Sequence, residues 1–274
     1  MPRPVSTSRV RYYSAALVDR ASALRPLARL RERVIAWRAP ELAGPARDGL
    51  PLPPARLRVL VDGEGDPERF LRAAEEIAAT IRRTLAAAGA PLNDREAVLD
   101  FGCGCGRVAR RWATLSGPQL HGCDYNRALV AWCRDNLTHM EFRENELEPP
   151  SPYADGTFDL VYAISILTHL TEPLARAWLA DWVRILRPGG LLLFSTHGDA
   201  FRGSLGAAAS RQYDAGRMVV TAPRMEGANA CVAHHPYRYV AGDLLGSFGL
   251  EVVSFTADPA PPGFRQDLYL VRRH

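Results

Sequence analysis

A glycine-rich turn in the sequence VLDFGCGCGRVARRW, residues 98–112, constrains the fold of this chain more than any other feature. Gly102, Gly104 and Gly106 follow the apolar strand AVLDF and precede a segment whose pattern predicts a helix from about Arg107. Such a turn is typical of the first unit of a parallel α/β sheet, where backbone N–H groups and a helix dipole can hold a ligand. The turn alone is weak evidence for a ligand, because tight turns also use glycine for purely structural reasons.

Strands and helices alternate along the chain from Ala97 onward. The strand-like stretches after the glycine turn are LHGCD, EFREN, FDLVYAI and GGLLLFST, and the helical ones include EPLARAWLADWVRIL and a helix from about Asn126. An irregular stretch from 198 to about 236 precedes one more helix, YRYVAGDLLGSFG, and two strands, LEVVSFTA and QDLYLVRR. Upstream, GDPERFLRAAEEIAATIRRTLAAAG predicts an amphipathic helix with Asp66 as its N-cap. The alternation predicts an α/β fold with a parallel sheet covered on both faces.

The chain before this region is basic and then rich in proline and glycine. Residues 1–40 contain nine arginines and two acidic residues, and residues 39–56 read APELAGPARDGLPLPPAR. We interpret residues 1–56 as a basic arm or lid followed by a connector, with Tyr12 and Tyr13 as side chains that could fold over a ligand. The arm is expected to be a solvated helix; a nucleic-acid or membrane-surface patch and an organelle transit peptide are the alternatives.

Composition excludes several reaction classes. The chain of 274 residues contains no lysine, so its 34 basic positions are all arginine, which excludes Schiff-base chemistry with pyridoxal phosphate and a phosphate-loop lysine. The five cysteines fit neither a zinc-ligand spacing nor a disulfide framework, which predicts buried, reduced thiols and no metal site. The sequence has no long apolar run and no secretory signal, so we expect a cytoplasmic protein without a membrane span.

Two carboxylates beside the glycine turn discriminate between cofactors. Asp100 stands two residues before Gly102, where its negative charge would repel a pyrophosphate but suit an ammonium and a sulfonium. The glycine spacing also lacks the extra residue that a dinucleotide fingerprint prefers. Asp124 ends the next strand, where a carboxylate can accept hydrogen bonds from both hydroxyls of a ribose or cap the following helix. The pattern favours S-adenosylmethionine, although NAD would satisfy Asp124 equally well.

Four motifs, in order and spacing, resemble those of class I S-adenosylmethionine-dependent methyltransferases: VLDFGCGCGRV, GCDYN, ENELEPPSPYADGTFDLVYAISILTHL and LRPGGLLLF. They cover about residues 97–196, and within that superfamily the chain resembles bacterial enzymes that methylate small molecules, including natural products. The resemblance implies a Rossmann-like three-layer sandwich around a seven-stranded sheet of order 3-2-1-4-5-7-6, mostly parallel with the last strand antiparallel. It further implies that residues 57–274 form the methyltransferase domain after a helical N-terminal extension, with 198–236 as an insertion that caps the substrate.

The resemblance also implies where the cofactor binds. Asp100 would lie near the methionine ammonium and Arg107 near the carboxylate, while Asp124 would hold the ribose, Tyr125 would line the adenine, and Ser165 would lie close to the transferable methyl. The complete set of cofactor-binding residues implied in this way is Asp100, Gly102, Cys103, Gly104, Arg107, Asp124, Tyr125, Asn145, Glu146, Ala163 and Ser165.

The chemistry of a sulfonium sets what else the site needs. Methyl transfer is an in-line displacement that leaves S-adenosylhomocysteine, so the protein chiefly aligns the acceptor and excludes water. A hydroxyl or acidic-carbon acceptor benefits from a base. His169 and His197 are the first candidates, because they follow strands at the carboxyl edge of the sheet, where ligands bind. His234 and His235 in the cap are further candidates, and each of the four can instead be structural.

The acceptor is expected to be a small molecule. Enzymes that methylate nucleic-acid bases carry an Asn/Asp-Pro-Pro-aromatic motif after the fourth strand, where this chain has AISILTHL, so nucleic acid is a disfavoured substrate. Three alternatives stay open at this stage. They are a non-methylating use of S-adenosylmethionine, such as cyclisation, a binding or regulatory protein, and an NAD-linked oxidoreductase.

Overall fold

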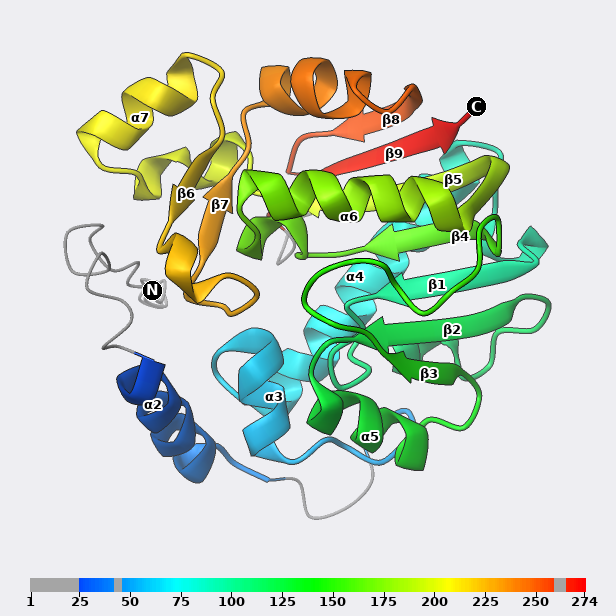
Figure 1. The fold of residues 1–274 in the computed structure, drawn as a ribbon. Coiled ribbons are helices and arrows are strands. Elements are labelled where there is room, and N and C mark those ends of the chain that lie inside the picture. The colour runs from blue at the N-terminus through cyan, green and yellow to red at the C-terminus, as the bar shows by residue number, and fades with distance from the viewer. Residues whose placement is uncertain (1–24, 42–45, 259–264) are drawn as a thin grey trace, which may run out of the picture.

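The computed structural model describes residues 25–41, 46–258 and 265–274 (Figure 1). The helices are α2 (Arg25–Arg38), α3 (Ala55–Asp62), α4 (Pro67–Ala87), α5 (Arg127–Asn136), α6 (Glu172–Ile185) and α7 (Ala207–Asp214). The strands are β1 (Ala97–Phe101), β2 (Gln119–Asp124), β3 (Glu141–Glu144), β4 (Phe158–Ala163), β5 (Leu186–Thr196), β6 (Val219–Thr221), β7 (Val232–His234), β8 (Leu250–Thr256) and β9 (Asp267–Arg273). Most of the predicted basic arm, with Tyr12 and Tyr13, lies outside the described residues.

Seven strands form one sheet in the order β3-β2-β1-β4-β5-β9-β8. Strands β1 to β5 are mutually parallel, and β9 runs antiparallel to both of its neighbours. The labels β8 and β9 arise because the hairpin β6–β7 interrupts the chain and forms a separate two-stranded sheet. Counted within the large sheet alone, the order is 3-2-1-4-5-7-6 with the last strand antiparallel, so the predicted fold class is confirmed.

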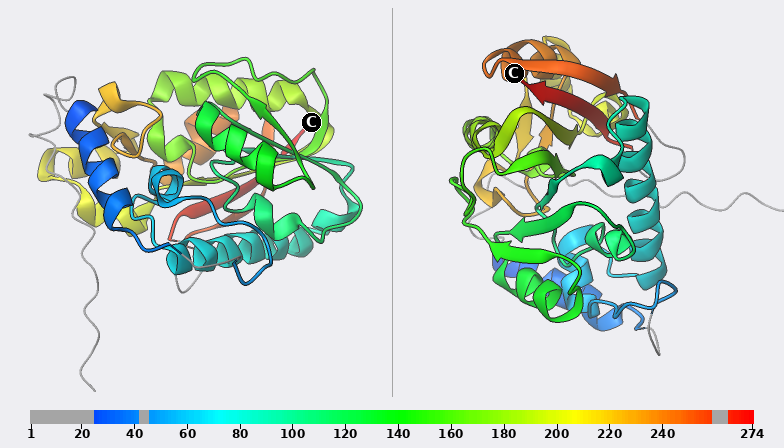
Figure 2. Two further views of the ribbon diagram at one scale, coloured as in Figure 1. Left: turned by 90° about the horizontal axis from the view of Figure 1, so that it is seen from below. Right: turned by 90° about the vertical axis from the view of Figure 1, so that its right-hand side faces the viewer.

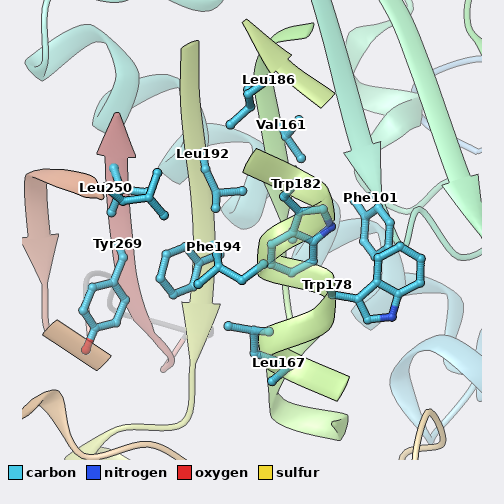
Figure 3. Close-up of a cluster of buried hydrophobic side chains, with 14 of the residues drawn as sticks. Phe101, Val161, Leu167, Trp178, Trp182, Leu186, Leu192, Phe194, Leu250 and Tyr269 are labelled. Atoms are coloured by element: carbon cyan, nitrogen blue, oxygen red, sulfur yellow. The ribbon is translucent and has the colours of Figure 1, made fainter. Parts of the chain in front are cut away.

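Helices cover the two faces of the sheet (Figure 2). Alternate side chains of β1 belong to two different buried clusters, one on each face. On one face, Leu99 and Phe101 of β1 belong to a buried cluster with Trp178 and Trp182 of α6. Figure 3 shows Phe101 beside the two tryptophans. On the other face, Val98 belongs to a second buried cluster that includes residues of α4 and α5. The near-continuous burial of β1 is what a parallel strand between two helical layers requires.

The segment after the glycine turn is shorter and tighter than predicted. Instead of a regular helix from about Arg107, the chain forms a single 3-10 turn, Ala109–Trp112. Two large side chains explain the difference, since Arg110 and Trp112 are both buried although they are only two residues apart. The predicted N-cap Asp66 is confirmed by its hydrogen bond from Arg69 N at 2.7 Å, which starts α4.

Residues 198–236, predicted to be irregular, contain regular elements of their own. They include α7 and the hairpin β6–β7, which lies beyond the carboxyl ends of the parallel strands (Figure 1). The predicted last helix is also present, but its middle part, Tyr239–Leu244, is π-helical. No helix in the described parts of the chain is long and apolar enough to cross a bilayer.

Two buried arginines hold the described part of the connector against the domain. Arg58 has no exposed side-chain surface, pairs with Glu41 at 3.0 Å and donates to three backbone carbonyls. Arg110 is equally buried and makes a two-pronged ion pair with Asp48 at 2.6 and 2.7 Å. A guanidinium presents a rigid fork of donors, which suits it to such buried, multiply bonded positions.

Candidate functional site

A pocket opens at the carboxyl ends of β1, β2 and β4. Its volume is about 440 Å³ including the part open to solvent, and a second hollow continues from it past Tyr125, Asn145 and Glu146 toward Arg127. This is the edge at which parallel α/β sheets bind their ligands. The pocket is lined by Phe101, Gly102, Asp124, Tyr125, Asn145, Glu146, Leu147, Ser165, Ile166, His169, Leu170, Trp178 and Gly227.

The glycine turn approaches the pocket with its bare backbone. Gly102, Gly104 and Gly106 have φ angles of 73°, 57° and 74°, which glycine adopts far more readily than other residues. A Cβ atom on Gly102 would lie 2.0 Å from Cδ1 of Ile166. The turn therefore requires glycine for conformation and for space, and it leaves the pocket wall free of a side chain at this point.

Asp124 is fastened to the glycine turn by its own carboxylate. Its Oδ2 accepts from Gly104 N at 3.0 Å and its Oδ1 from Asn126 N at 2.8 Å. Burial raises the pKa of Asp124 to about 6, although the two amide donors lower it. The N-cap of α5 is Asn126, whose side chain accepts from Ala128 N, so the alternative role of Asp124 as the cap of this helix is wrong.

Asp100 lies behind the turn in a nearly closed environment. It is 4% exposed, and its Oδ2 has no hydrogen-bond partner among the described residues. Burial raises its pKa to about 7, the neighbouring Tyr162 hydroxyl lowers it, and the charge of Asp124 raises it again. Tyr162 in turn accepts a hydrogen bond from Trp112 Nε1 at 2.8 Å. An unsatisfied carboxylate of this kind is a strong candidate to face a bound cation.

Six of the predicted cofactor residues line the pocket and five do not. The six are Gly102, Asp124, Tyr125, Asn145, Glu146 and Ser165. Asp100, Cys103 and Gly104 lie on the strand and turn behind the wall, and the side chain of Ala163 is part of the hydrophobic core. Arg107 is half-buried, its Nε has no partner within the described chain, and burial lowers its pKa. All five cysteines are described; they are buried and free.

Ser165 holds an unusual backbone conformation at the end of β4. Its φ angle is 60°, and its N–H donates to Ser195 Oγ at 2.8 Å. The amide of Gln266 joins both serines, since Oε1 accepts from Ser195 Oγ at 2.7 Å and Nε2 donates to Ser165 Oγ at 2.5 Å. Positive φ at a residue other than glycine persists only where surrounding bonds enforce it, and such positions cluster at functional sites.

His169 lines the pocket and has a defined tautomer. Its Nδ1 lies 2.8 Å from the carbonyl oxygen of Cys231, and a carbonyl only accepts, so Nδ1 carries the proton and Nε2 the lone pair. Burial lowers the pKa of His169. The ring is therefore neutral near pH 7, with Nε2 making no hydrogen bond within the described residues.

His197 does not line the pocket but lies beside His169, with 6.5 Å between the ring centres. It is 7% exposed and stacks on Phe201 at 4.0 Å. Burial lowers its pKa well below the usual range, and the nearby His169, His234 and His235 lower it further. The structure thus brings the two predicted catalytic histidines together and leaves only one of them at the pocket wall. In the described parts of the chain, no group of three or more His, Cys, Asp or Glu side chains is arranged to hold a metal ion.

Residues 225–231, in the connection between β6 and β7, cover the pocket, whose wall includes Gly227. We call this segment the cap loop. Tyr125 donates to Gly227 O at 2.7 Å, and Gly227 N donates to His169 O at 2.9 Å. Asn229 reaches Leu60 O of α3 at 3.0 Å. Residues such as Gly227 and Gln266 were missed by sequence reasoning, because they lie in segments without a recognisable motif.

The strand order and the helices on both faces of the sheet define a Rossmann-like α/β fold, with the pocket at the carboxyl ends of its parallel strands. A solved 1,6-didemethyltoxoflavin-N1-methyltransferase from Burkholderia thailandensis aligns with 100% of this chain and 93% of its own, with a TM-score of 0.54 and 16% identity. An S-adenosylmethionine-dependent methyltransferase from Mesorhizobium loti aligns with 70% of this chain and 96% of its own, with a TM-score of 0.52 and 18% identity. These likenesses show the fold.

Sequence comparison agrees with the fold. Residues 98–190 match the family model described as a methyltransferase domain. A malonyl-[acyl-carrier protein] O-methyltransferase from Pectobacterium atrosepticum is 32% identical over 114 residues, 42% of this chain and 44% of that protein. A ubiquinone biosynthesis O-methyltransferase from Xanthomonas oryzae pv. oryzae is 32% identical over 103 residues, 36% of this chain and 42% of that protein. The chain thus spans less than half the length of these curated relatives, and its resemblance to class I S-adenosylmethionine-dependent methyltransferases is confirmed.

Proposed function

We propose that this chain is an S-adenosylmethionine-dependent methyltransferase that acts in the cytoplasm on a small molecule of specialised metabolism. The observation that carries the proposal is the position of Asp124, at the end of β2, in the wall of the pocket and bonded to the glycine turn. Two carboxylate oxygens offer about four acceptor sites, and two of these are used by Gly104 N and Asn126 N. The remaining sites suit the two hydroxyls of a ribose.

Residues in the pocket wall and directly behind it complete a site for this cofactor, which when bound supplies an electrophilic methyl group on a positively charged sulfur. Asp100 pairs with the ammonium of the methionine part, because an adjacent cation stabilises the ionised carboxylate that burial otherwise destabilises. Tyr125 lines the adenine, and the second hollow, with Asn145 and Glu146, holds its edge. Gly102 and Ser165 border the methionine part, and Ala163 contributes only through its backbone position.

His169 is the residue that we propose to remove a proton from the acceptor. Its Nδ1 proton is held by Cys231 O, so Nε2 is free to accept a proton from a hydroxyl or an acidic carbon. Two relatives are named O-methyltransferases, which makes hydroxyl compounds the first acceptors to test. His197 remains the second candidate, and Arg107 a candidate for the cofactor carboxylate.

The segments outside the shared core would define the acceptor. We propose that residues 198–236 form the cap of a methyltransferase domain that spans 57–274, and that residues 1–56 form its arm and connector. The cap loop supports this view, because its bonds to Tyr125 and His169 close the pocket directly above the proposed base.

The proposal is tested by calorimetric titration of the chain with S-adenosylhomocysteine and, separately, with NADH. We expect saturable binding of the first ligand alone. Asp124→Ala should weaken it by at least about tenfold, since hydrogen bonds to a charged acceptor are lost. Asp135→Ala, which removes an exposed carboxylate of α5, is the matched control and should leave the affinity unchanged. Binding of NADH instead, or of neither ligand, would overturn the proposal.

A further inference from the structure

Helix α2 exposes an apolar stripe on a chain segment that is otherwise basic. Leu30, Val34 and Trp37 are 57%, 40% and 83% exposed, and Trp37 is the most exposed of the large hydrophobic residues in the described chain. Their spacing of four and three residues places them within about 60° of arc on one face of the helix. An apolar stripe of this kind needs an occupant, because water solvates it poorly.

Arginines flank the stripe on both sides. Arg33 and Arg29 lie within about 100° of its centre on one side, and Arg38 and Arg31 within about 100° on the other. The single acidic residue of α2, Glu32, is half-buried on the opposite, inward face. The exposed face of α2 is thus an apolar centre between two rows of cations, with no carboxylate to repel an anionic surface.

Helix α2 lies at the end of the sheet where the pocket forms (Figure 1). Helix α2 packs against α3, beyond the carboxyl ends of β1 to β3, as both views of the fold show (Figures 1 and 2). Burial raises the pKa of the Tyr125 hydroxyl, and the charges of Asp124 and Glu32 raise it further. Glu32 is therefore close to a residue of the pocket wall, and the outer face of the same helix points away from it.

We infer that α2 is an interfacial helix that docks the chain on an anionic phospholipid surface. An apolar stripe between arginines fits such a surface, because the apolar side chains enter the acyl boundary while guanidinium groups meet the phosphates. A tryptophan in the stripe adds to this, since indole rings concentrate at the level of lipid headgroups. A protein partner would need both an acidic surface and an apolar groove matched to this stripe, whereas an anionic bilayer supplies negative charge and apolar depth without such matching. The inference does not depend on the proposed methyl transfer.

The test is sedimentation of the full chain with vesicles of phosphatidylcholine alone or mixed equally with phosphatidylglycerol. We expect binding to the mixed vesicles only, and binding that weakens as salt is raised. Trp37 is an internal reporter, because the other four tryptophans are buried or half-buried, so mixed vesicles should shift the emission to shorter wavelength. Trp37→Phe should remove most of this shift, while Trp132→Phe should retain it.

Charge variants decide whether the contact is specific. Arg33→Gln combined with Arg38→Gln should lower the partition coefficient about 25-fold, roughly fivefold for each arginine. Arg211→Gln with Arg217→Gln, at and beyond the end of α7, is the matched control and should bind like the parent chain. Equal binding to both vesicle types, binding to neither, or an unchanged partition of the α2 variant would refute the inference. Protection of Trp37 fluorescence from quenching by acrylamide in the free chain would also refute the inference, because the apolar stripe would then already be covered. Both variants should still bind S-adenosylhomocysteine, so failure here is separable from failure of the proposed function.

Discussion

Replacing Asp100 by asparagine should stabilise the unliganded fold, and more so at high pH than at low pH. The folded chain holds this carboxyl at a pKa of about 7, chiefly through burial, whereas its ordinary value is 3.8. Between about pH 4 and pH 7 the native state therefore keeps a proton that the unfolded chain has lost. Stability conferred by this site is present at low pH and is lost as the pH rises through the window.

The size of the effect follows from the two pKa values. Compared with low pH, the difference between these pKa values lowers the free energy of unfolding by roughly 2 kcal/mol at pH 5, where the native carboxyl is still protonated, and by roughly 4 kcal/mol at pH 8, where it is ionised. Asparagine has the same shape and no charge, so the gain from Asp100→Asn should be roughly 2 to 3 kcal/mol larger at pH 8 than at pH 5. The packing of the asparagine side chain contributes equally at both pH values, so it does not affect this difference.

Urea unfolding, followed by fluorescence at pH 5, 6, 7 and 8 without cofactor, measures this gain directly. Asp124, whose pKa burial raises to about 6, titrates in both chains, so its contribution largely cancels. Asp135→Asn, which removes an exposed carboxylate of α5, is the control for the loss of one charge at the surface. A constant gain for Asp100→Asn, or one that shrinks as the pH rises, would show that the carboxyl is not held neutral by burial. Weaker binding of S-adenosylhomocysteine by the stabilised variant would link this instability to the cofactor.

Three further predictions concern the pocket and the core. His169→Gln should lower kcat by about 10² to 10⁴ and S-adenosylhomocysteine affinity far less, since its ring also bonds Cys231 O of the cap loop. Because burial lowers the pKa of His169, the parent kcat should fall with acid only below pH 6.5. Gly227→Ala should weaken cofactor binding measured by calorimetry, because φ is 82° at this residue and the added Cβ would lie 2.6 Å from Cδ1 of Leu147. Equal affinity of the variant and the parent chain would argue against close packing at Gly227. Trp112→Phe should destabilise the chain by about 1 kcal/mol more than Trp182→Phe in urea, because only the first indole N–H has a hydrogen-bond partner in the described chain; equal losses would contradict this.

The large sheet could be predicted because its information is local. The central parallel strands β1, β4 and β5 contain short apolar runs, and glycine or polar residues follow them, so the local pattern indicates where these strands begin and end. The helix predicted from about Arg107 was wrong for a reason that lies outside the segment. The side chain of Arg110 is drawn inward by Asp48, which is 62 residues earlier in the chain. No periodicity within the segment reports such a partner.

The residues of the site also divide into those that a local sequence pattern predicts and those that it does not. Asp124 and Ser165 follow strands within motifs, and the structure places both at the pocket. Gly227, from a short hairpin, reaches the pocket only after the chain has folded. Gln266, at the entry to β9, does not line the pocket but bonds Ser165, which does. A polar residue directly before a buried strand is a possible signal for Gln266, whereas the three-residue strands of the hairpin offer no pattern that separates them from loop.

The cap loop meets the pocket mainly through its main chain. Tyr125 and His169 bond to the carbonyl oxygens of Gly227 and Cys231, and Gly227 N bonds to the carbonyl oxygen of His169. Every amino acid supplies a carbonyl, so most positions of this loop can change in the course of evolution while closure over the cofactor is inherited intact. A lineage could thus explore new acceptors one substitution at a time without first losing a working site. The same tolerance recommends positions 228 and 230 as the place to randomise when new acceptors are sought, with Asn229 kept for its side-chain bond to Leu60 O.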